Sequence, residues 1–150
     1  KKIIPNCGIS SDVIAGFCGE TEEEHQDTLS LMQYAQFDFS YMYYYSERPG
    51  TMAAKKYTDD VPLETKKRRL AEIVEVQYQL SLQNNLKDVG KIYEVLVEKT
   101  SKKNEEEWSG RNEQNKVIIF PKGNYKVGDY VNVLVESANK ATLKGIVIDN

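Results

Sequence analysis

The sequence is poor in the residues that build metal centres and disulfide frameworks. Its 150 residues contain two cysteines and one histidine. Two cysteines cannot make a disulfide framework, and the spacing of Cys7 and Cys18 matches no zinc or iron–sulfur ligand set. We therefore expect two core or loop thiols, no metal site and no complete catalytic constellation within these residues.

Long hydrophobic runs are also lacking. The longest cover four or five residues, such as Val117 to Phe120, whereas a membrane-spanning helix needs about 20. The first residues do not resemble a signal peptide. We therefore expect a cytoplasmic protein with no membrane partner, in which ten Tyr and four Phe help to supply a core.

Charge is nearly balanced overall but uneven along the chain. There are 20 Lys and Arg against 23 Asp and Glu, a net charge of −3. Residues 1–60 hold 5 basic and 10 acidic side chains, residues 61–85 hold 4 and 3, and residues 86–150 hold 11 and 10. The last segment is close to neutral, so it would meet an anionic partner only through a local patch.

The first sixty residues predict a strand, a glycine-containing turn, a helix and a second strand. Residues 10–17 (SSDVIAGF) form a near-continuous apolar run, typical of a mostly buried parallel strand. Thr21 and Glu24 have the spacing of a capping box at the start of a helix over 21–36. The aromatic segment 37–45 predicts the next strand, which completes a βαβ unit.

A single βαβ unit is too small to fold alone, because parallel strands need a wider sheet covered on both faces. We therefore expect residues 1–60 to be a piece of a larger α/β domain whose remainder lies before Lys1. His25, the one histidine, lies on the apolar stripe of the helix. A packed ring is favoured there over a catalytic base or a ligand.

A turn at Arg48–Thr51 and a polar loop precede a long helix that begins near Pro62 and ends by Gly90. The basic run Lys66 to Arg69 lies in its first turns, where positive charge opposes the helix dipole. Another reason for keeping these four residues is therefore expected, and tRNA binding is one candidate.

From residue 91 the pattern becomes all-β, with five short runs rich in Val and Ile or bounded by turn residues. Five strands in about 60 residues predict a small closed barrel of the oligonucleotide-binding (OB) type. The fold class is thus α/β plus all-β, in three parts: a barrel piece over 1–60, a linking helix over 61–85 and an RNA-binding domain over 86–150. The predicted strands are 92–97, 108–112, 117–120, 130–135 and 143–148.

Two segments are candidate sites. The first is Asp12 to Glu20 (DVIAGFCGE), at the carboxyl end of a strand, where glycine lets backbone approach a cofactor; a tight turn that needs glycine for its geometry is the alternative. The second is a cluster of basic and amide side chains that could hold RNA, with Glu105 to Glu107 favouring a merely solvated rim. Its members are Lys102, Lys103, Arg111, Asn115, Lys116 and Lys122.

Three motifs, in this order, resemble one enzyme family. IPNCGISSDVIAGFCGETEEEHQDT and YYYSERPGTMAAK are similar to a late barrel strand and the following strand and loop of the radical-SAM tRNA methylthiotransferases. The C-terminal part resembles a TRAM domain, in which SGRNEQNKVIIF is similar to the members acting on N6-isopentenyladenosine. Cys18, Glu47 and Met52 replace prolines of the family pattern, and His25 stands where Phe is usual, which strengthens its packing interpretation.

The resemblance implies a function for the longer protein. It would be a methylthiotransferase that adds a methylthio group to C2 of N6-isopentenyladenosine next to the anticodon, with S-adenosylmethionine (SAM) and two 4Fe–4S clusters as cofactors. The last two strands of a six-stranded partial barrel would lie within residues 9–45. The CxxxCxxC motif for the radical cluster is not in this sequence, so we expect these 150 residues alone to be inactive and to bind none of these cofactors.

The resemblance also suggests roles for individual residues. Tyr45, Ser46 and Arg48 would line the substrate side, and Lys91, Arg111, Asn115 and Lys116 would join Lys102 and Lys103 on the RNA-holding surface, with tRNA as partner. The residues expected near the SAM adenine and ribose are Asp12, Ile14, Gly16, Phe17 and Gly19.

Two other interpretations stay open at this stage: a stand-alone RNA-binding module, and a protein-binding adaptor. Clustered Lys with Asn favours RNA over protein. In addition, the exposed edges of strands 9–17 and 37–45 predict possible self-association.

Overall fold

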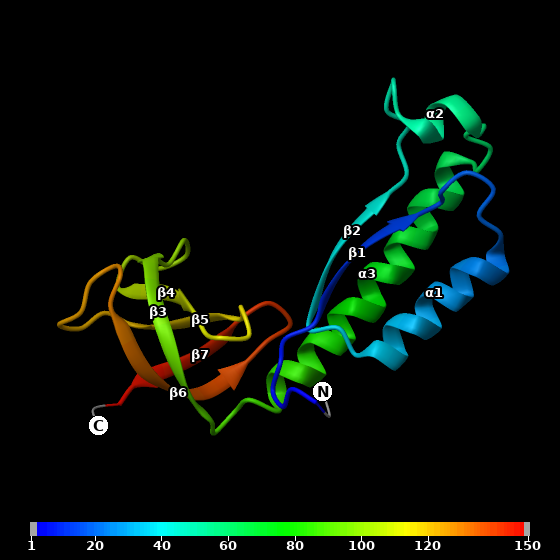
Figure 1. Cartoon of the computed structure of the whole chain (residues 1–150). Helices are drawn as coiled ribbons and strands as arrows, with labels where there is room; N and C mark the ends of the chain where they lie inside the picture. Colours follow the sequence, from blue (N-terminus) through cyan, green and yellow to red (C-terminus); the bar gives the residue numbers. More distant parts are fainter. Residues whose placement is uncertain (1–2, 149–150) are drawn as a thin grey trace. The chain divides into compact units, whose positions relative to one another are not determined.

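The structure, a computed structural model, describes residues 3–148 and contains two compact units (Figure 1). One unit runs from Ser10 to Leu80, and the other combines the residues up to Ile9 with those from Ser81 onward. The long helix α3 (Leu63–Leu86) supplies residues to both units. The predicted division at residues 60 and 85 stays a prediction.

The first unit contains the predicted βαβ arrangement. Strands β1 (Ser10–Ala15) and β2 (Phe39–Tyr44) pair in parallel, and helix α1 (Glu22–Ala35) connects them. The capping box forms as expected: the Thr21 hydroxyl accepts from the Glu24 amide at 3.2 Å, and the Glu24 carboxylate accepts from the Thr21 amide at 2.8 Å. Three acidic residues in the first turn of α1 complement the helix dipole.

Only one face of this two-stranded sheet is covered. Ala15 of β1 packs with Met32 of α1 and Ile73 of α3 in a buried cluster, and Figure 1 shows both helices beside the strands. On the opposite face, Ile14 is 53% exposed and Tyr43 is 60% exposed. The expectation that the first strand is mostly buried is therefore wrong for the described residues, because the open face has no covering layer there.

The segment between β2 and α3 differs from the expected polar loop. It contains a short helix, α2 (Met52–Lys56), whose cap is Thr51: its hydroxyl accepts from the Ala54 amide at 3.3 Å. Two alanines and two lysines are good helix formers, so a single capped turn suffices. Helix α3 begins directly after Pro62, as predicted.

The second unit is a closed five-stranded barrel with the strand order β3-β4-β5-β7-β6. All its pairs are antiparallel except β5 with β7, which is parallel. Counted within the barrel, the order is 1-2-3-5-4, a Greek-key arrangement. The prediction of a small closed barrel of the OB type is confirmed. Its strands are β3 (Ile92–Thr100), β4 (Glu107–Arg111), β5 (Val117–Pro121), β6 (Tyr130–Ala138) and β7 (Leu143–Val147).

Alternate residues of the strands fill the barrel. The interior is formed by seven side chains that are at most 1% exposed: Val95, Val97, Ile118, Phe120, Val133, Val135 and Leu143. Gly110 lets β4 approach β3 closely, since a Cβ at this position would lie 2.3 Å from the Leu96 carbonyl oxygen. Among the described residues, no helix is both long and apolar enough to cross a membrane.

Candidate nucleic-acid interface

One pocket on the barrel concentrates cations. We call it the lysine pocket; its volume is about 290 Å³, and it lies over the outer faces of β4 and β5 between the β3–β4 and β6–β7 loops. Five basic side chains line it against two acidic ones, Glu98 and Glu107. The basic members are Lys99, Lys102, Lys103, Arg111 and Lys144.

The lysines of this pocket are mostly uncompensated. No ion pair with a described residue involves Lys99, Lys102 or Lys103, and the Lys144 ammonium lies 3.4 Å from the Glu107 carboxylate. Val117 and Ile119 of β5 add an apolar floor. Free ammonium groups around an apolar floor suit a phosphodiester chain whose sugars or bases rest on the floor.

The location supports the same chemistry. In five-stranded barrels of this topology, the face of the second and third strands, with the loops between strands one and two and between strands four and five, takes oligonucleotides. In this chain these elements are β4, β5, the β3–β4 loop and the β6–β7 loop, which are the elements that line the lysine pocket.

Lys116 and Lys91 lie elsewhere and have partners. Lys116 is 9% exposed and its ammonium contacts the carboxylate of Asp88 at 2.6 Å. Lys91 contacts the other oxygen of Asp88 at 3.1 Å, and the Tyr93 hydroxyl donates to the same oxygen at 2.7 Å. Burial acts to raise the pKa of Asp88, but the hydrogen bonds from Lys116, Tyr93 and Lys91 outweigh it and lower the pKa. The expectation that Lys116 lies on an RNA-holding surface does not fit its burial, since this ammonium group neutralises an interior carboxylate.

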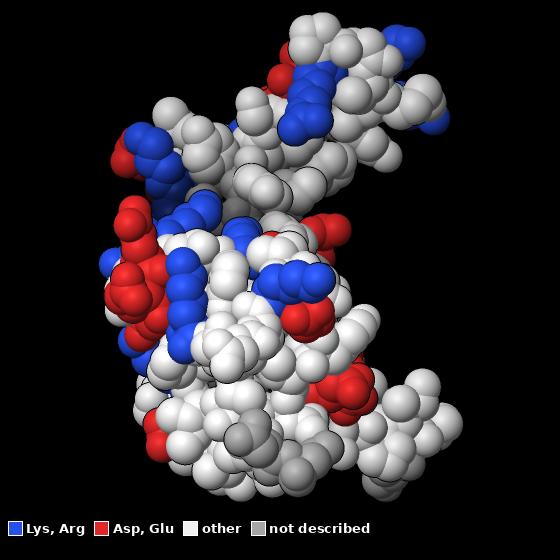
Figure 2. Space-filling view, turned by 90° about the vertical axis from the view of Figure 1, so that its left-hand side faces the viewer, with Lys and Arg blue, Asp and Glu red and all other residues white. Residues whose placement is uncertain are grey.

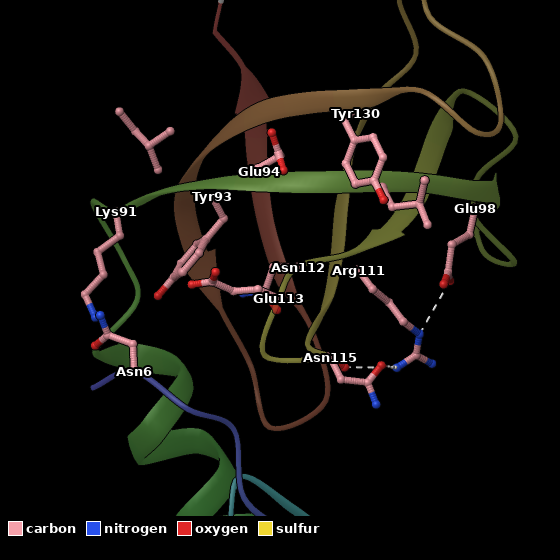
Figure 3. A pocket seen from close by; sticks show the side chains of 12 residues that line it. Asn6, Lys91, Tyr93, Glu94, Glu98, Arg111, Asn112, Glu113, Asn115 and Tyr130 are labelled. Atoms are coloured by element: carbon pink, nitrogen blue, oxygen red, sulfur yellow. Dashed lines mark hydrogen bonds and ion pairs between the residues drawn. The ribbon is translucent and has the colours of Figure 1, made fainter. Parts of the chain in front are cut away.

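Arg111 and Asn115 belong to a second, larger pocket of about 820 Å³ (Figure 3), which we call the β3-face pocket. The Arg111 guanidinium donates to the backbone and side-chain oxygens of Asn115, both at 2.9 Å, and contacts Glu98 at 3.4 Å. The guanidinium plane is therefore held in one orientation. Arg111 and Glu98 line both pockets, so the two are contiguous.

The four basic residues Lys66 to Arg69 of α3 form ion pairs within their own unit. Lys66 pairs with Asp59, Lys67 with Glu64, Arg68 with Glu22 and Glu72, and Arg69 with Glu20 and Glu22. These carboxylates give a structural reason for keeping the run despite the helix dipole, and its part in tRNA binding stays a prediction. Arg68 is also the main cause that lowers the pKa of Glu22 to about 2.

His25 is fully buried, as its place on the apolar stripe predicted, and its Nε2 lies 2.7 Å from the Glu72 carboxylate. Its ring, Glu22 and Glu72 bring three possible ligand atoms within 4.8 Å. The two carboxylates already face Arg68, which supplies the positive charge that a metal would bring. The cysteines are half-buried free thiols.

The expected cofactor and substrate residues meet in part on the open face of the first unit. Ile14 lines a pocket of about 610 Å³ together with Tyr45, Ser46 and Arg48. The Tyr45 ring packs edge-on against Phe17 at 5.0 Å, and the Lys66 ammonium lies 5.1 Å from its centroid. Burial, with a smaller effect of Cys18, raises the pKa of Tyr45.

The glycines of this region have local reasons for being glycine. Gly16 has φ +70°, and a Cβ there would lie 2.4 Å from the Lys66 side chain. The Gly16 amide donates to Glu20 and the Gly19 amide to Asp60, both at 2.7 Å. Neither amide is therefore free for a cofactor in this conformation, and the placement of both glycines near SAM stays a prediction. Asp12 is exposed on β1.

Two members of the lysine pocket were not predicted from the sequence. Lys99 lies near the end of one strand and Lys144 near the start of the last one, so neither stands in a basic run, and only barrel closure brings them beside Lys102 and Lys103. Figure 2 shows Lys and Arg interspersed with Asp and Glu on the face that it draws, which agrees with the balanced composition. The number of lysines is thus not the useful signal; what matters is which of them lie together after barrel closure and lack a carboxylate.

The closed Greek-key barrel and its lysine pocket define a small nucleic-acid-binding domain joined to an α/β unit. Residues 86–148 match the TRAM domain family, so the chain contains a TRAM domain. This confirms the resemblance of the C-terminal part and agrees with the strand order of the barrel.

Nearly all of the chain is similar to proteins named tRNA-2-methylthio-N(6)-dimethylallyladenosine synthase. It is 62% identical over 140 residues to the one from Amoebophilus asiaticus, covering 93% of this chain and 29% of that protein. The relative from Christiangramia forsetii is 59% identical, and the match covers 97% of this chain and 30% of that protein. The relative from Bacteroides thetaiotaomicron is 50% identical, and the match covers 97% of this chain and 32% of that protein. The chain thus spans about a third of these relatives and matches their C-terminal part.

Proposed function

We propose that this chain is the C-terminal part of a tRNA-modifying enzyme, and that its TRAM barrel holds the tRNA. The reaction would add a methylthio group to C2 of N6-isopentenyladenosine next to the anticodon. The observation that carries the proposal is the similarity over nearly the whole chain to synthases of this name. The lysine pocket on the oligonucleotide-binding face of the barrel supports it independently.

The barrel's part is to bind the sugar–phosphate backbone. Lys99, Lys102 and Lys103 have no carboxylate to displace, so they can take up phosphates without first breaking an ion pair with a described residue. Lys91, Arg111, Asn115 and Lys116 are engaged with protein groups. We therefore assign phosphate contacts to the lysine pocket and not to Lys116.

The α/β unit's part is to form a section of the wall around the cofactor site. Its open face offers Asp12, Ile14 and Tyr43 to whatever lies above the sheet, and an exposed apolar strand face is typical of a sheet that continues or is covered. SAM, when bound in the longer protein, would supply the deoxyadenosyl radical and the methyl group. Ile14 with Tyr45 and Arg48 would then shape the side where cofactor and base meet.

The RNA-binding proposal is tested by titrating the chain with tRNA over a series of salt concentrations, using fluorescence anisotropy. Removing one lysine that binds a phosphate should reduce the slope of log affinity against log salt by about 0.7 to 0.9. We expect that reduction for Lys102→Ala and for Lys103→Ala. Lys126→Ala is the matched control, because Lys126 is exposed on the same barrel but lines neither barrel pocket. Affinity that does not change with salt would refute a phosphate-led interaction.

The catalytic proposal needs the longer polypeptide of which this chain would be the C-terminal part. Incubated with SAM, reductant and tRNA carrying N6-isopentenyladenosine, it should yield the methylthio nucleoside by mass spectrometry. The 150-residue chain alone, loaded with iron and sulfide, should yield no deoxyadenosine. Any deoxyadenosine formed by it would contradict the proposed inactivity.

A further inference from the structure

The outer face of β3 carries an arrangement that phosphate binding does not use. Leu96 lies opposite Arg111 of β4 on one side and opposite Tyr130 of β6 on the other. Directly opposed residues in an antiparallel pair project to the same face of the sheet. The Tyr130 ring, the Leu96 side chain and the Arg111 guanidinium therefore lie side by side across β6, β3 and β4, and all three line the β3-face pocket. Figure 3 labels Tyr130 and Arg111.

The two flanking groups are suited to stacking. Tyr130 is 65% exposed, so its ring does not pack in the barrel core and is accessible to a ligand. The Arg111 guanidinium is fixed by the two oxygens of Asn115 and by Glu98. A pre-oriented guanidinium plane and a tyrosine ring are the two surfaces on which proteins stack unpaired bases.

The charges of this pocket exclude a phosphate as its main ligand. Three carboxylates line it (Glu94, Glu98 and Glu113) against two cations, each of which faces a carboxylate. Glu94 and Glu113 are in no ion pair with a described residue. A free carboxylate only accepts hydrogen bonds, so it favours the amino group of a base over an anion.

We propose that the β3-face pocket binds an unpaired nucleobase that carries an exocyclic amino group, stacked between Tyr130 and Arg111 with Glu94 accepting from the amino group. This inference rests on the proposed function, because the occupant is a base of the same RNA whose phosphates lie in the lysine pocket. The two pockets share Arg111 and Glu98, so one strand can pass from one to the other. A basic peptide would also meet the carboxylates, but it would be repelled by the adjoining free lysines.

The inference separates two kinds of interaction on one barrel. The lysine pocket supplies affinity that falls with salt, whereas the β3-face pocket supplies base preference that does not. Uracil is disfavoured, since two carbonyl oxygens flank its single ring N–H and would face the Glu94 carboxylate. Adenine, cytosine and guanine each present an amino group instead.

The test uses the 150-residue chain and an RNA stem–loop in which 2-aminopurine, a fluorescent base with an amino group, replaces each loop position in turn. Stacking quenches its emission, so we expect quenching on binding at one position. Tyr130→Leu should abolish that quenching and weaken binding about tenfold, with the salt slope unchanged. Tyr34→Leu is the matched control, because Tyr34 is 89% exposed on α1 and lines no barrel pocket.

A second variant tests the hydrogen bond rather than the stack. Glu94→Gln should reduce the preference for an amino base over uracil at the quenched position, whereas Glu136→Gln, an exposed change on β6 outside both barrel pockets, should retain it. The inference is overturned if Tyr130→Leu binds and quenches like the unchanged chain, or if a basic peptide competes at this face better than RNA. In either case, an affinity of the unchanged chain that falls with salt and is reduced by Lys102→Ala would still support the proposed function. If the unchanged chain showed no salt-dependent binding of RNA, both the proposed function and this inference would be refuted.

Discussion

The buried carboxylate of Asp88 should be a larger contributor to barrel stability than the lysine that faces it. The two side chains are 4% and 8% exposed and 2.6 Å apart, with Lys116 donating to Asp88. Removing one partner of a buried pair typically costs about 3–5 kcal/mol, because the other charge is left without compensation. The two partners differ in what remains after each deletion.

After Lys116→Met, Asp88 retains donors from Tyr93 at 2.7 Å and Lys91 at 3.1 Å. We therefore expect a loss near or below the lower end of that range, about 2–3 kcal/mol. After Asp88→Ala, three donors lose their shared acceptor, and the expected loss is about 4–5 kcal/mol. Urea unfolding followed by the emission of Trp108, which packs against the barrel core, reports on this unit.

The contribution of the Asp88 carboxylate to the free energy of unfolding should depend on pH, and the direction follows from its pKa. The pKa of Asp88 is lowered in the folded chain from its ordinary value of 3.8. A carboxyl whose folded pKa is depressed stabilises the fold above its unfolded pKa, and that stability is lost as pH falls through the folded pKa. The stability difference between the unchanged chain and Asp88→Asn should therefore be constant near neutral pH and shrink below about pH 4. If Lys116→Met proved the more damaging change, or if the difference grew in acid, the assigned network would be incorrect.

Three single features of the fold give further expected outcomes. Gly110→Val should destabilise the barrel by about 2–3 kcal/mol, because the valine Cβ would lie 2.3 Å from the Leu96 carbonyl oxygen. Urea unfolding measures this change, and a loss of stability under about 0.5 kcal/mol would contradict the close approach of the two strands. Arg68→Gln should leave the salt slope of tRNA binding unchanged, since Arg68 already pairs with Glu22 and Glu72; a slope reduced as much as by Lys102→Ala would show that the run does bind RNA. Self-association through the edges of β1 and β2 should appear as a concentration-dependent mass in sedimentation; a monomer at all concentrations would show that these edges are protected in another way.

The elements of the fold were largely readable from the sequence because they depend on local patterns. The Thr21–Glu24 spacing fixed the start of α1, Pro62 fixed that of α3, and short Val and Ile runs separated by turns indicated the barrel strands. Helix α2 was missed, since one turn of helix carries no periodicity and its only signal is the cap residue Thr51. The burial of β1 was overestimated because an apolar run does not show how many of its faces are covered.

The site was predicted less well, because a lysine's role depends on its partners. Lys102 and Lys116 look equally available in the sequence, yet one is exposed on a loop and the other neutralises Asp88, which lies 28 positions away. The same holds for the run at Lys66 to Arg69, whose carboxylates come from up to 49 residues away. Ion pairs between distant segments are created by the fold, so composition alone cannot separate structural cations from those that meet a ligand.

The difference between paired and unpaired cations also explains how a nearly neutral barrel could bind a polyanion, as we propose. Several of its cations are internally compensated, and compensated cations contribute little to the attraction of phosphate. Attraction then depends on lysines left without a carboxylate, and three of these, Lys99, Lys102 and Lys103, lie together where β4, β5 and two loops meet. Arg111 lies at the border of that site, held by Glu98 and Asn115, so its charge is offset while its plane stays oriented. The proposed RNA binding therefore needs no large positive net charge; it needs Lys99, Lys102 and Lys103 to stay unpaired and Arg111 to stay fixed.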